Sequence, residues 1–272
     1  MTATTALQSL KDRHRTTWAA GDYGAVADAL VLEIGERIVE RVGPGPESEV
    51  LDVATGTGSA AIPAAQRGAR VVGLDLVGDL LAVARRRAAD AGVDVEWIEG
   101  DAEDLPFADG SFDVVLSTLG VQFTPRHEDS ARELVRVCRP GGTIAVANWT
   151  PQGYIGRFFK TLSPYMPPLP EGASPPPLWG DEGHVERLLG GAVTSLEFER
   201  STVDFVHESP EAFIEFMAGN YGPLVMARKA LTPQGRWEDL RRDLIELSTA
   251  ANLARDGRFR VPSEYLLAVA RT

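Results

Sequence analysis

The stretch VLDVATGTGSAA, residues Val50 to Ala61, joins a short apolar run, a glycine-rich turn and the start of an alanine-rich segment. This order is typical of a buried strand, a tight loop and a helix in an α/β sheet. Gly56 and Gly58 let the backbone approach a ligand closely, and the N-terminus of the following helix offers unpaired N–H groups. The stretch therefore predicts a ligand-binding turn at the end of the first strand.

Strand and helix patterns alternate along the residues that flank this turn. The predicted strands of this part are residues 50–53, 71–74, 93–98, 112–117 and 143–149, and the predicted helices include residues 25–42, 79–91 and 127–137. Short strands that are apolar throughout, alternating with helices, are typical of a parallel sheet covered on both faces. Together with two later strands, the sequence predicts a doubly wound, mostly parallel, seven-stranded α/β sheet.

The rest of the chain divides into a lid, a cap and a last strand. Residues 1–45 are predicted to form an N-terminal helical lid on a core at residues 46–152. Residues 153–258 are predicted to form a mainly helical substrate cap, with one returning sheet strand near residues 193–199. Residues 259–272 are predicted to hold the final strand of the sheet.

Prolines mark a loop and two helix starts within the predicted cap. Seven of the fourteen residues from Pro164 to Pro177 are proline, which favours a stiff surface loop. Ser209-Pro210 and Thr232-Pro233 each put a capping hydroxyl before a proline, which predicts a helix start at both places.

Charge and cysteine content exclude several classes of function. The 272 residues carry 27 Lys and Arg against 39 Asp and Glu, a net charge of −12. Nucleic-acid-binding proteins normally gather basic residues on one face, so no nucleic-acid partner is expected. With one cysteine, Cys138, neither a disulfide nor a thiolate metal site is expected within the chain. No signal peptide or membrane span is recognisable, so we expect a cytoplasmic protein without membrane contact or metal, and a homodimer is compatible with the sequence.

Two cofactors fit the glycine turn. Gly56, Gly58 and Ala61 match the dinucleotide-binding pattern G-x-G-x-x-G/A, and Asp75 follows Gly56 by nineteen residues, so NAD is an alternative. With either cofactor, Asp75 at the end of the second strand would accept hydrogen bonds from ribose hydroxyls. Asp52 lies four residues before Gly56, where a carboxylate can hold a ligand ammonium but sits awkwardly beside a pyrophosphate. Asp52 therefore favours a ligand that carries a positive charge.

Three further motifs follow near the later strands, namely Gly100 to Phe107, Ser111 to Val115, and Arg136 to Gly142. Over residues 47–149 the chain resembles the class I S-adenosylmethionine (SAM)-dependent methyltransferases, most closely the small-molecule group that includes the ubiquinone and menaquinone C-methyltransferases. The resemblance implies a Rossmann-like fold, SAM as cofactor, and methyl transfer to an oxygen or carbon of a small organic molecule. A SAM-binding cyclase or isomerase that does not methylate is an alternative, as is an NAD-dependent oxidoreductase.

The resemblance also implies roles for individual residues. Asp75 would bind the ribose, and Leu76 would pack on the adenine. Asp101 and the backbone of Ala102 would bind the adenine edge. The methionine half of SAM and the transferred methyl would face residues of the turn and of the fourth strand end, namely Asp52, Ala54, Thr55, Gly56, Gly58, Ser117, Thr118 and Leu119. The family usually has glycine at the position of Ala54.

Substrate contacts and a general base are expected just beyond the fourth strand and in the cap. The candidate substrate contacts are Gln122, Phe123, Tyr165 and Trp179. His127 is the candidate general base, because an imidazole can take up a proton near neutral pH. Glu103 and Asp104 are interpreted as solvated loop charges, and Trp18 in the lid as a packing residue.

Overall fold

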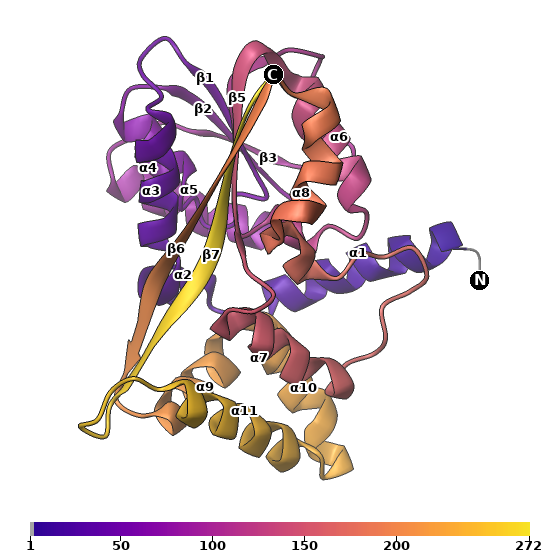
Figure 1. Cartoon of the computed structure of the whole chain (residues 1–272), viewed down its shortest axis with the longest axis vertical. Coiled ribbons are helices and arrows are strands. Elements are labelled where there is room, and N and C mark those ends of the chain that lie inside the picture. Colours follow the sequence, from indigo (N-terminus) through magenta and orange to yellow (C-terminus); the bar gives the residue numbers. More distant parts are fainter. Residues whose placement is uncertain (1–2) are drawn as a thin grey trace.

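A seven-stranded sheet forms the centre of the computed structural model, which describes residues 3–272 (Figure 1). The strand order is β3-β2-β1-β4-β5-β7-β6, with β7 antiparallel to both of its neighbours and the other pairs parallel. The strands are β1 (Glu49–Val53), β2 (Arg70–Asp75), β3 (Glu96–Glu99), β4 (Phe112–Thr118), β5 (Cys138–Trp149), β6 (Ser195–His207) and β7 (Phe259–Arg271). The predicted doubly wound, mostly parallel fold is confirmed.

The strand order reverses at β1, which provides a position for a ligand site. β1 pairs with β2 on one side and β4 on the other, so the chain leaves β1 in one direction along the sheet and later returns to its other side. The register sets Val53 beside Leu74 and Asp52 beside Leu116, which brings the carboxyl ends of these strands together. In open α/β sheets such a reversal of strand order opens a crevice above the strand ends.

Helices cover both faces of the sheet. On one face, α3 (Leu32–Val42) and α4 (Ala61–Gln66) share an apolar core with β1, β2, β4 and β5. On the other face, α6 (His127–Val137) packs on β4 and β5, and α8 (Glu182–Leu189) packs on β6 and β7. The helix α5 (Gly78–Asp90) packs against β2 and β3. Because the central strands β1 and β4 are buried from both sides, apolar side chains occupy most of their positions, whereas the edge strand β6 carries many exposed polar residues.

The predicted helix over residues 25–42 is wrong in one respect, because the structure divides it at Val31. Helix α2 (Tyr23–Leu30) contacts β6 and α9 (Pro210–Asn220), whereas α3 packs on the central strands. Val31 has φ −124° and separates the two. Before them, α1 (Ala3–Ala19) crosses the molecule below the sheet (Figure 1). The first two residues of the predicted lid lie outside the described residues.

Four helices gather at the end of the molecule away from the sheet (Figure 1). They are α7 (Tyr154–Leu162), α9, α10 (Gly222–Leu231) and α11 (Trp237–Ala251), and the long β6–β7 ribbon reaches them from the sheet. Short 3-10 turns complete the fold, namely η1 (Val121–Phe123), η2 (Ser163–Tyr165), η3 (Pro176–Gly180), η4 (Gly190–Ala192) and η5 (Thr232–Gln234). No helix of residues 3–272 is long and apolar enough to cross a membrane.

Three details of the predicted cap differ from the structure. The helix α8 packs against α6 on the sheet, so this part of residues 153–258 covers the core and not the cavity described below. The returning strand is longer than predicted, because β6 pairs with β7 along its whole length. Ser209 caps α9 as expected, but Thr232-Pro233 forms only η5, since Gly235 turns the chain through a left-handed φ of 68° before α11 begins.

Candidate active site

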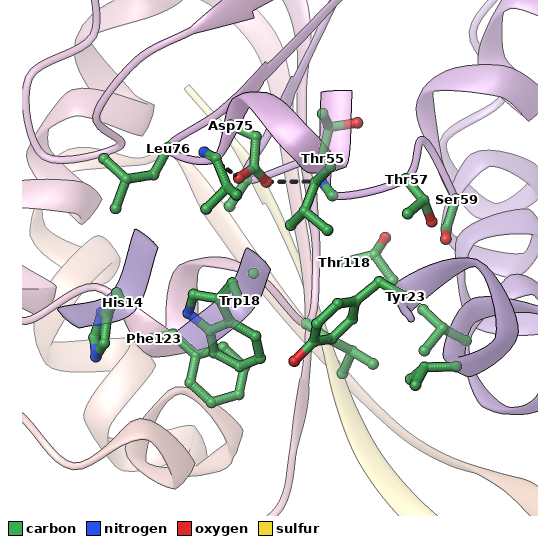
Figure 2. Close-up of a pocket in the computed structure, with 18 of the residues that line it drawn as sticks. His14, Trp18, Tyr23, Thr55, Thr57, Ser59, Asp75, Leu76, Thr118 and Phe123 are labelled. Carbon is green, nitrogen blue, oxygen red and sulfur yellow. Dashed lines mark hydrogen bonds between the residues drawn. The ribbon is translucent and has the colours of Figure 1, made fainter. Parts of the chain in front are cut away.

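One cavity lies at the carboxyl ends of β1, β2 and β4, where the strand order reverses. The loops after these strands and after β3 line one side, and Figure 2 shows them facing His14, Trp18 and Tyr23 of α1 and α2. The cap contributes apolar and aromatic side chains, namely Ile155, Phe158, Phe159, Met217 and Tyr221. The cavity therefore joins polar strand ends to an apolar wall.

Close backbone approach shapes the glycine turn. Gly58 has φ +86°, and a Cβ on it would lie 2.9 Å from the Trp97 ring, so only glycine fits here without strain. Gly120 lies against the turn from the β4 side, where a Cβ would lie 2.5 Å from the Cβ of Ala54. Ala54 and Leu119 both have positive φ, 53° and 58°, and both line the cavity. Left-handed backbone at two non-glycine residues is a mark of functional loops.

Asp75 is the central acid of the cavity. Its carboxylate oxygens accept hydrogen bonds from the backbone N–H of Gly56 at 2.8 Å and of Val77 at 3.0 Å (Figure 2). Burial raises the pKa of Asp75 to about 6, although these N–H groups oppose the shift. Each carboxylate oxygen has more than one lone pair, so Asp75 can still accept hydroxyl donors from a ligand.

Asp52 lies beneath the glycine turn and does not line the cavity. One of its oxygens, Oδ2, accepts hydrogen bonds from the Thr55 hydroxyl at 2.6 Å and the Ala61 N–H at 3.0 Å. Its other oxygen, Oδ1, is buried and has no partner among the described residues. Burial raises the pKa of Asp52 to about 7. Asp52 therefore stabilises the turn from below. Because Asp52 does not line the cavity, its carboxylate is not placed to form the predicted contact with a ligand ammonium.

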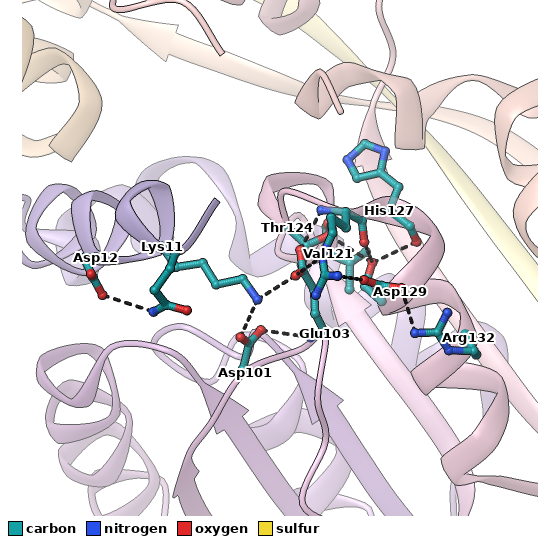
Figure 3. Close-up of polar contacts among 12 residues, drawn as sticks. Lys11, Asp12, Asp101, Glu103, Val121, Thr124, His127, Asp129 and Arg132 are labelled. Carbon is teal, nitrogen blue, oxygen red and sulfur yellow. Dashed lines mark hydrogen bonds and ion pairs between the residues drawn. The ribbon is translucent and has the colours of Figure 1, made fainter. Parts of the chain in front are cut away.

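Asp101 follows β3 and lines the cavity beneath α1. Lys11 of α1 places its Nζ 2.6 Å from Asp101 Oδ2 and 2.6 Å from Glu103 Oε2 (Figure 3). Glu103 also accepts hydrogen bonds from the backbone N–H and the Nε of Arg126. The interpretation of Glu103 as a solvated charge is wrong, because its side chain is fully buried in this ion cluster. Asp104 is exposed.

His127 lies outside the cavity, on the α8 side of the sheet. Its ring is fully buried, with Nδ1 3.1 Å from His184 Nε2 and Nε2 3.2 Å from the carbonyl oxygen of Gln122. Burial lowers the pKa of His127 to about 4, so the ring is neutral. This position contradicts the general-base hypothesis, because both ring nitrogens already have protein partners and neither reaches the cavity.

Five other predicted contacts are placed away from the cavity, among them Gly58, whose missing side chain would meet Trp97 and Ile62. Ser117 is buried and donates its hydroxyl to the Val53 carbonyl, and the Gln122 amide donates to the Leu119 carbonyl. Trp179 is fully buried beside His127. Tyr165 donates its hydroxyl to Asp243 within the cap. The predicted residues that do line the cavity are Ala54, Thr55, Gly56, Asp75, Leu76, Asp101, Ala102, Thr118, Leu119 and Phe123.

Several lining residues were not predicted. Lys11, His14 and Tyr23 reach the cavity from α1 and α2, and Trp18 does so although its ring was interpreted as packing. The spacing of Lys11, His14 and Trp18 by three and four residues puts them on one helix face, which is a signal that the sequence offered. Tyr221 lies between α9 and α10 and lines the cavity, and its local sequence does not indicate this position.

Known proteins are similar to this chain in sequence. The methyltransferase-domain family matches residues 51–146. Rv1405c of Mycobacterium tuberculosis, an uncharacterized protein, is 41% identical over 265 residues, which cover 97% of this chain and 95% of that protein. A demethylmenaquinone methyltransferase of Renibacterium salmoninarum is 41% identical over 151 residues, which cover 54% of this chain and 62% of the relative. The chain belongs to the class I SAM-dependent methyltransferases.

A solved structure agrees with the fold of this methyltransferase. The YcgJ protein of Bacillus subtilis superimposes with a TM-score of 0.62 at 15% identity, covering 88% of this chain and 98% of YcgJ. The cavity residues also fit SAM chemically. Asp75 offers acceptors for ribose hydroxyls, Leu76 and Leu80 offer apolar surface for a base, and the buried Thr118 hydroxyl has no partner among the described residues.

Proposed function

We propose that this methyltransferase binds SAM in the cavity and transfers its methyl group to an oxygen or carbon of a small organic molecule. The observation that carries the proposal is the cavity itself, which joins the acidic strand ends at Asp75 and Asp101 to an aromatic wall. A ligand with a polar nucleoside end and a reactive apolar end matches this division.

The charges at the polar end favour SAM over NAD. Lys11 is the one lysine or arginine among the lining residues, and its ammonium already pairs with Asp101 and Glu103. A pyrophosphate at the glycine turn would lie near the carboxylate of Asp75 without a free counter-charge. SAM carries positive charge on its sulfonium and ammonium groups, so the Asp75 carboxylate would attract it.

The chain contributes binding and positioning to the proposed reaction. Bound SAM supplies an electrophilic methyl carbon on its sulfonium sulfur. Asp75 would hold the ribose hydroxyls, while the backbone at Ala54, Gly56 and Leu119 would fix the methionine half. Trp18, Phe123 and Phe158 would exclude water from the acceptor. Holding the nucleophile in line with the methyl carbon removes much of the entropic part of the barrier.

Two measurements test the proposal. Isothermal titration with SAM, S-adenosylhomocysteine and NAD should give binding of the first two alone; tight NAD binding without SAM binding would contradict it. Incubation with methyl-labelled SAM and a metabolite panel, followed by mass spectrometry, should then give one product heavier by a labelled methyl group. SAM binding with a rearranged but unlabelled product would instead support the cyclase or isomerase alternative.

A further inference from the structure

A tight corner forms where the end of α1, the start of α2 and the start of α10 meet. A Cβ on Gly21 would lie 2.3 Å from the Asn220 carbonyl oxygen, and a Cβ on Gly222 would lie 2.0 Å from the Thr17 carbonyl oxygen. Such distances leave no room for any side chain, so the backbones of segments some 200 residues apart in sequence are in direct contact. The corner therefore fixes the residues next to it.

Tyr221 is held at this corner with its ring in an aromatic cluster. The hydroxyl oxygen of Tyr23 accepts a hydrogen bond from the Gly222 N–H at 3.0 Å, which ties α2 to the residue after Tyr221. The Trp18 ring lies 6.0 Å from the Tyr221 ring and 5.5 Å from the Tyr23 ring, both edge to face. Tyr221 also lines the cavity, so its position there is set by three elements.

The hydroxyl of Tyr221 has no hydrogen-bond partner among residues 3–272, although the residue is only 8% exposed. Burial raises its pKa far above neutrality, so the group remains an O–H donor. Tyrosine hydroxyls that are buried normally find a partner, because a lost hydrogen bond destabilises the folded state. A donor that the protein leaves unused in a ligand cavity is therefore available to a ligand.

The cap side of the cavity, where Tyr221 lies, favours a neutral ligand. Lys11 and Asp101 pair with each other, and Asp75 accepts hydrogen bonds from its own loop. The cap side of the cavity is lined by apolar and aromatic side chains, without a charged group among them. An acceptor carrying an ammonium or a carboxylate would therefore be buried without a counter-charge, which is costly.

We propose that Tyr221 binds the methyl acceptor by donating a hydrogen bond to an oxygen atom on a neutral, flat, apolar molecule. The role of this molecule as methyl acceptor rests on the proposed function. Its binding in the cavity does not depend on methyl transfer. The inferred class is an aromatic or cyclic compound that carries a hydroxyl or carbonyl oxygen. The hydrogen bond would orient the ring against Trp18 and Phe123.

The experiment uses the full chain saturated with S-adenosylhomocysteine and a matched set of probes. The probes are 2-naphthol, naphthalene, 2-naphthoate and 2-naphthylmethylammonium, titrated by calorimetry. We expect 2-naphthol to bind at least about tenfold more tightly than either charged probe. Tyr221→Phe should weaken 2-naphthol about fivefold, the effect of one hydrogen bond, and leave naphthalene unchanged. Tyr165→Phe, whose hydroxyl lies outside the cavity, is the control and should alter neither.

Three results would overturn the inference. They are failure of 2-naphthol to bind while S-adenosylhomocysteine binds, equal or tighter binding of a charged probe, and an unchanged ratio of 2-naphthol to naphthalene affinity in Tyr221→Phe. Circular dichroism and S-adenosylhomocysteine affinity of the variant check that it is folded. Failure of the unaltered protein to bind S-adenosylhomocysteine would instead count against the proposed function. Failure of the proposed function and failure of this inference are therefore distinguishable.

Discussion

The proposed cofactor side and the proposed acceptor side of the cavity are built by different means. On the cofactor side, Asp75 and the glycine turn belong to adjacent strands and hold each other through backbone hydrogen bonds. On the acceptor side, Trp18, Phe158 and Tyr221 come from helices far apart in the chain and meet only through tertiary packing. Local hydrogen bonds thus set the geometry of the polar strand ends, while packing between distant segments sets the geometry of the apolar wall.

A third region is the buried layer around His127, between α6 and α8. Its response to pH tests whether His127 is separate from the acceptor side of the cavity. The folded-state pKa of His127 is about 4, below its ordinary 6.5, so the unfolded chain binds a proton first as the pH falls. Stability should therefore fall between pH 6.5 and 4, by about 3 kcal/mol for this residue. Urea unfolding across this range should show a shallower loss for His127→Gln than for the unaltered protein.

The comparison with His127→Gln reports on the buried imidazole pair, because His184 lies 3.1 Å from His127 and burial lowers the pKa of His184 as well. The pKa of His14 is also lowered by burial, and its contribution is the same in both proteins. Identical pH slopes would show that His127 is accessible to solvent, and would return it to the list of candidate bases on the acceptor side.

Removal of the Asp75 carboxylate tests the cofactor side directly. Asp75→Ala should weaken SAM binding at least tenfold, about 1.4 kcal/mol, because the ribose hydroxyls lose their acceptor. Titration calorimetry measures this, with circular dichroism to verify the fold. Asp90→Ala, at the exposed end of α5, is the control. Unchanged affinity in Asp75→Ala would mean that the ribose lies elsewhere.

The same carboxylate predicts a pH dependence of binding. The raised pKa of Asp75, about 6, means that the carboxyl is protonated below that pH and is then a weaker acceptor. SAM affinity should therefore fall several-fold between pH 7 and pH 5, a change of roughly 1 kcal/mol. In Asp75→Asn the profile should be flatter; an equally steep profile in that variant would assign the dependence to another group, such as Asp52.

The smallest effect concerns Lys11, which links the two sides because α1 carries both Lys11 and Trp18. Lys11→Met removes the contact to Asp101 and Glu103, so α1 should open more often. Hydrogen–deuterium exchange of α1 amides should rise about fivefold, equivalent to roughly 1 kcal/mol. Asp12→Asn, in an exposed pair with Arg15, should leave exchange unchanged. No change in Lys11→Met would mean that aromatic packing alone holds α1.

The sequence predicted which strand ends and which turn meet at the cavity, because these signals are local. Alternating strands and helices, the turn at Gly56 and Gly58, and Asp75 at a strand end are all readable within short windows. His127 was misassigned because its closeness to β4 along the chain does not reveal that α6 turns the ring toward α8. Tyr221 could not be singled out from the other aromatic residues of the cap, since its place in the cavity depends on a contact between α1 and α10.

The sheet topology also has a consequence for how the protein is made. β6 has 13 residues and pairs only with β7, and the intervening residues 208–258 are synthesised before β7 appears. Until β7 is synthesised the β6 segment lacks its pairing partner, and a long unpaired strand segment is the kind that templates aggregation. Its exposed Glu197, Glu199, Arg200 and Asp204 are well placed to repel other chains until β7 arrives.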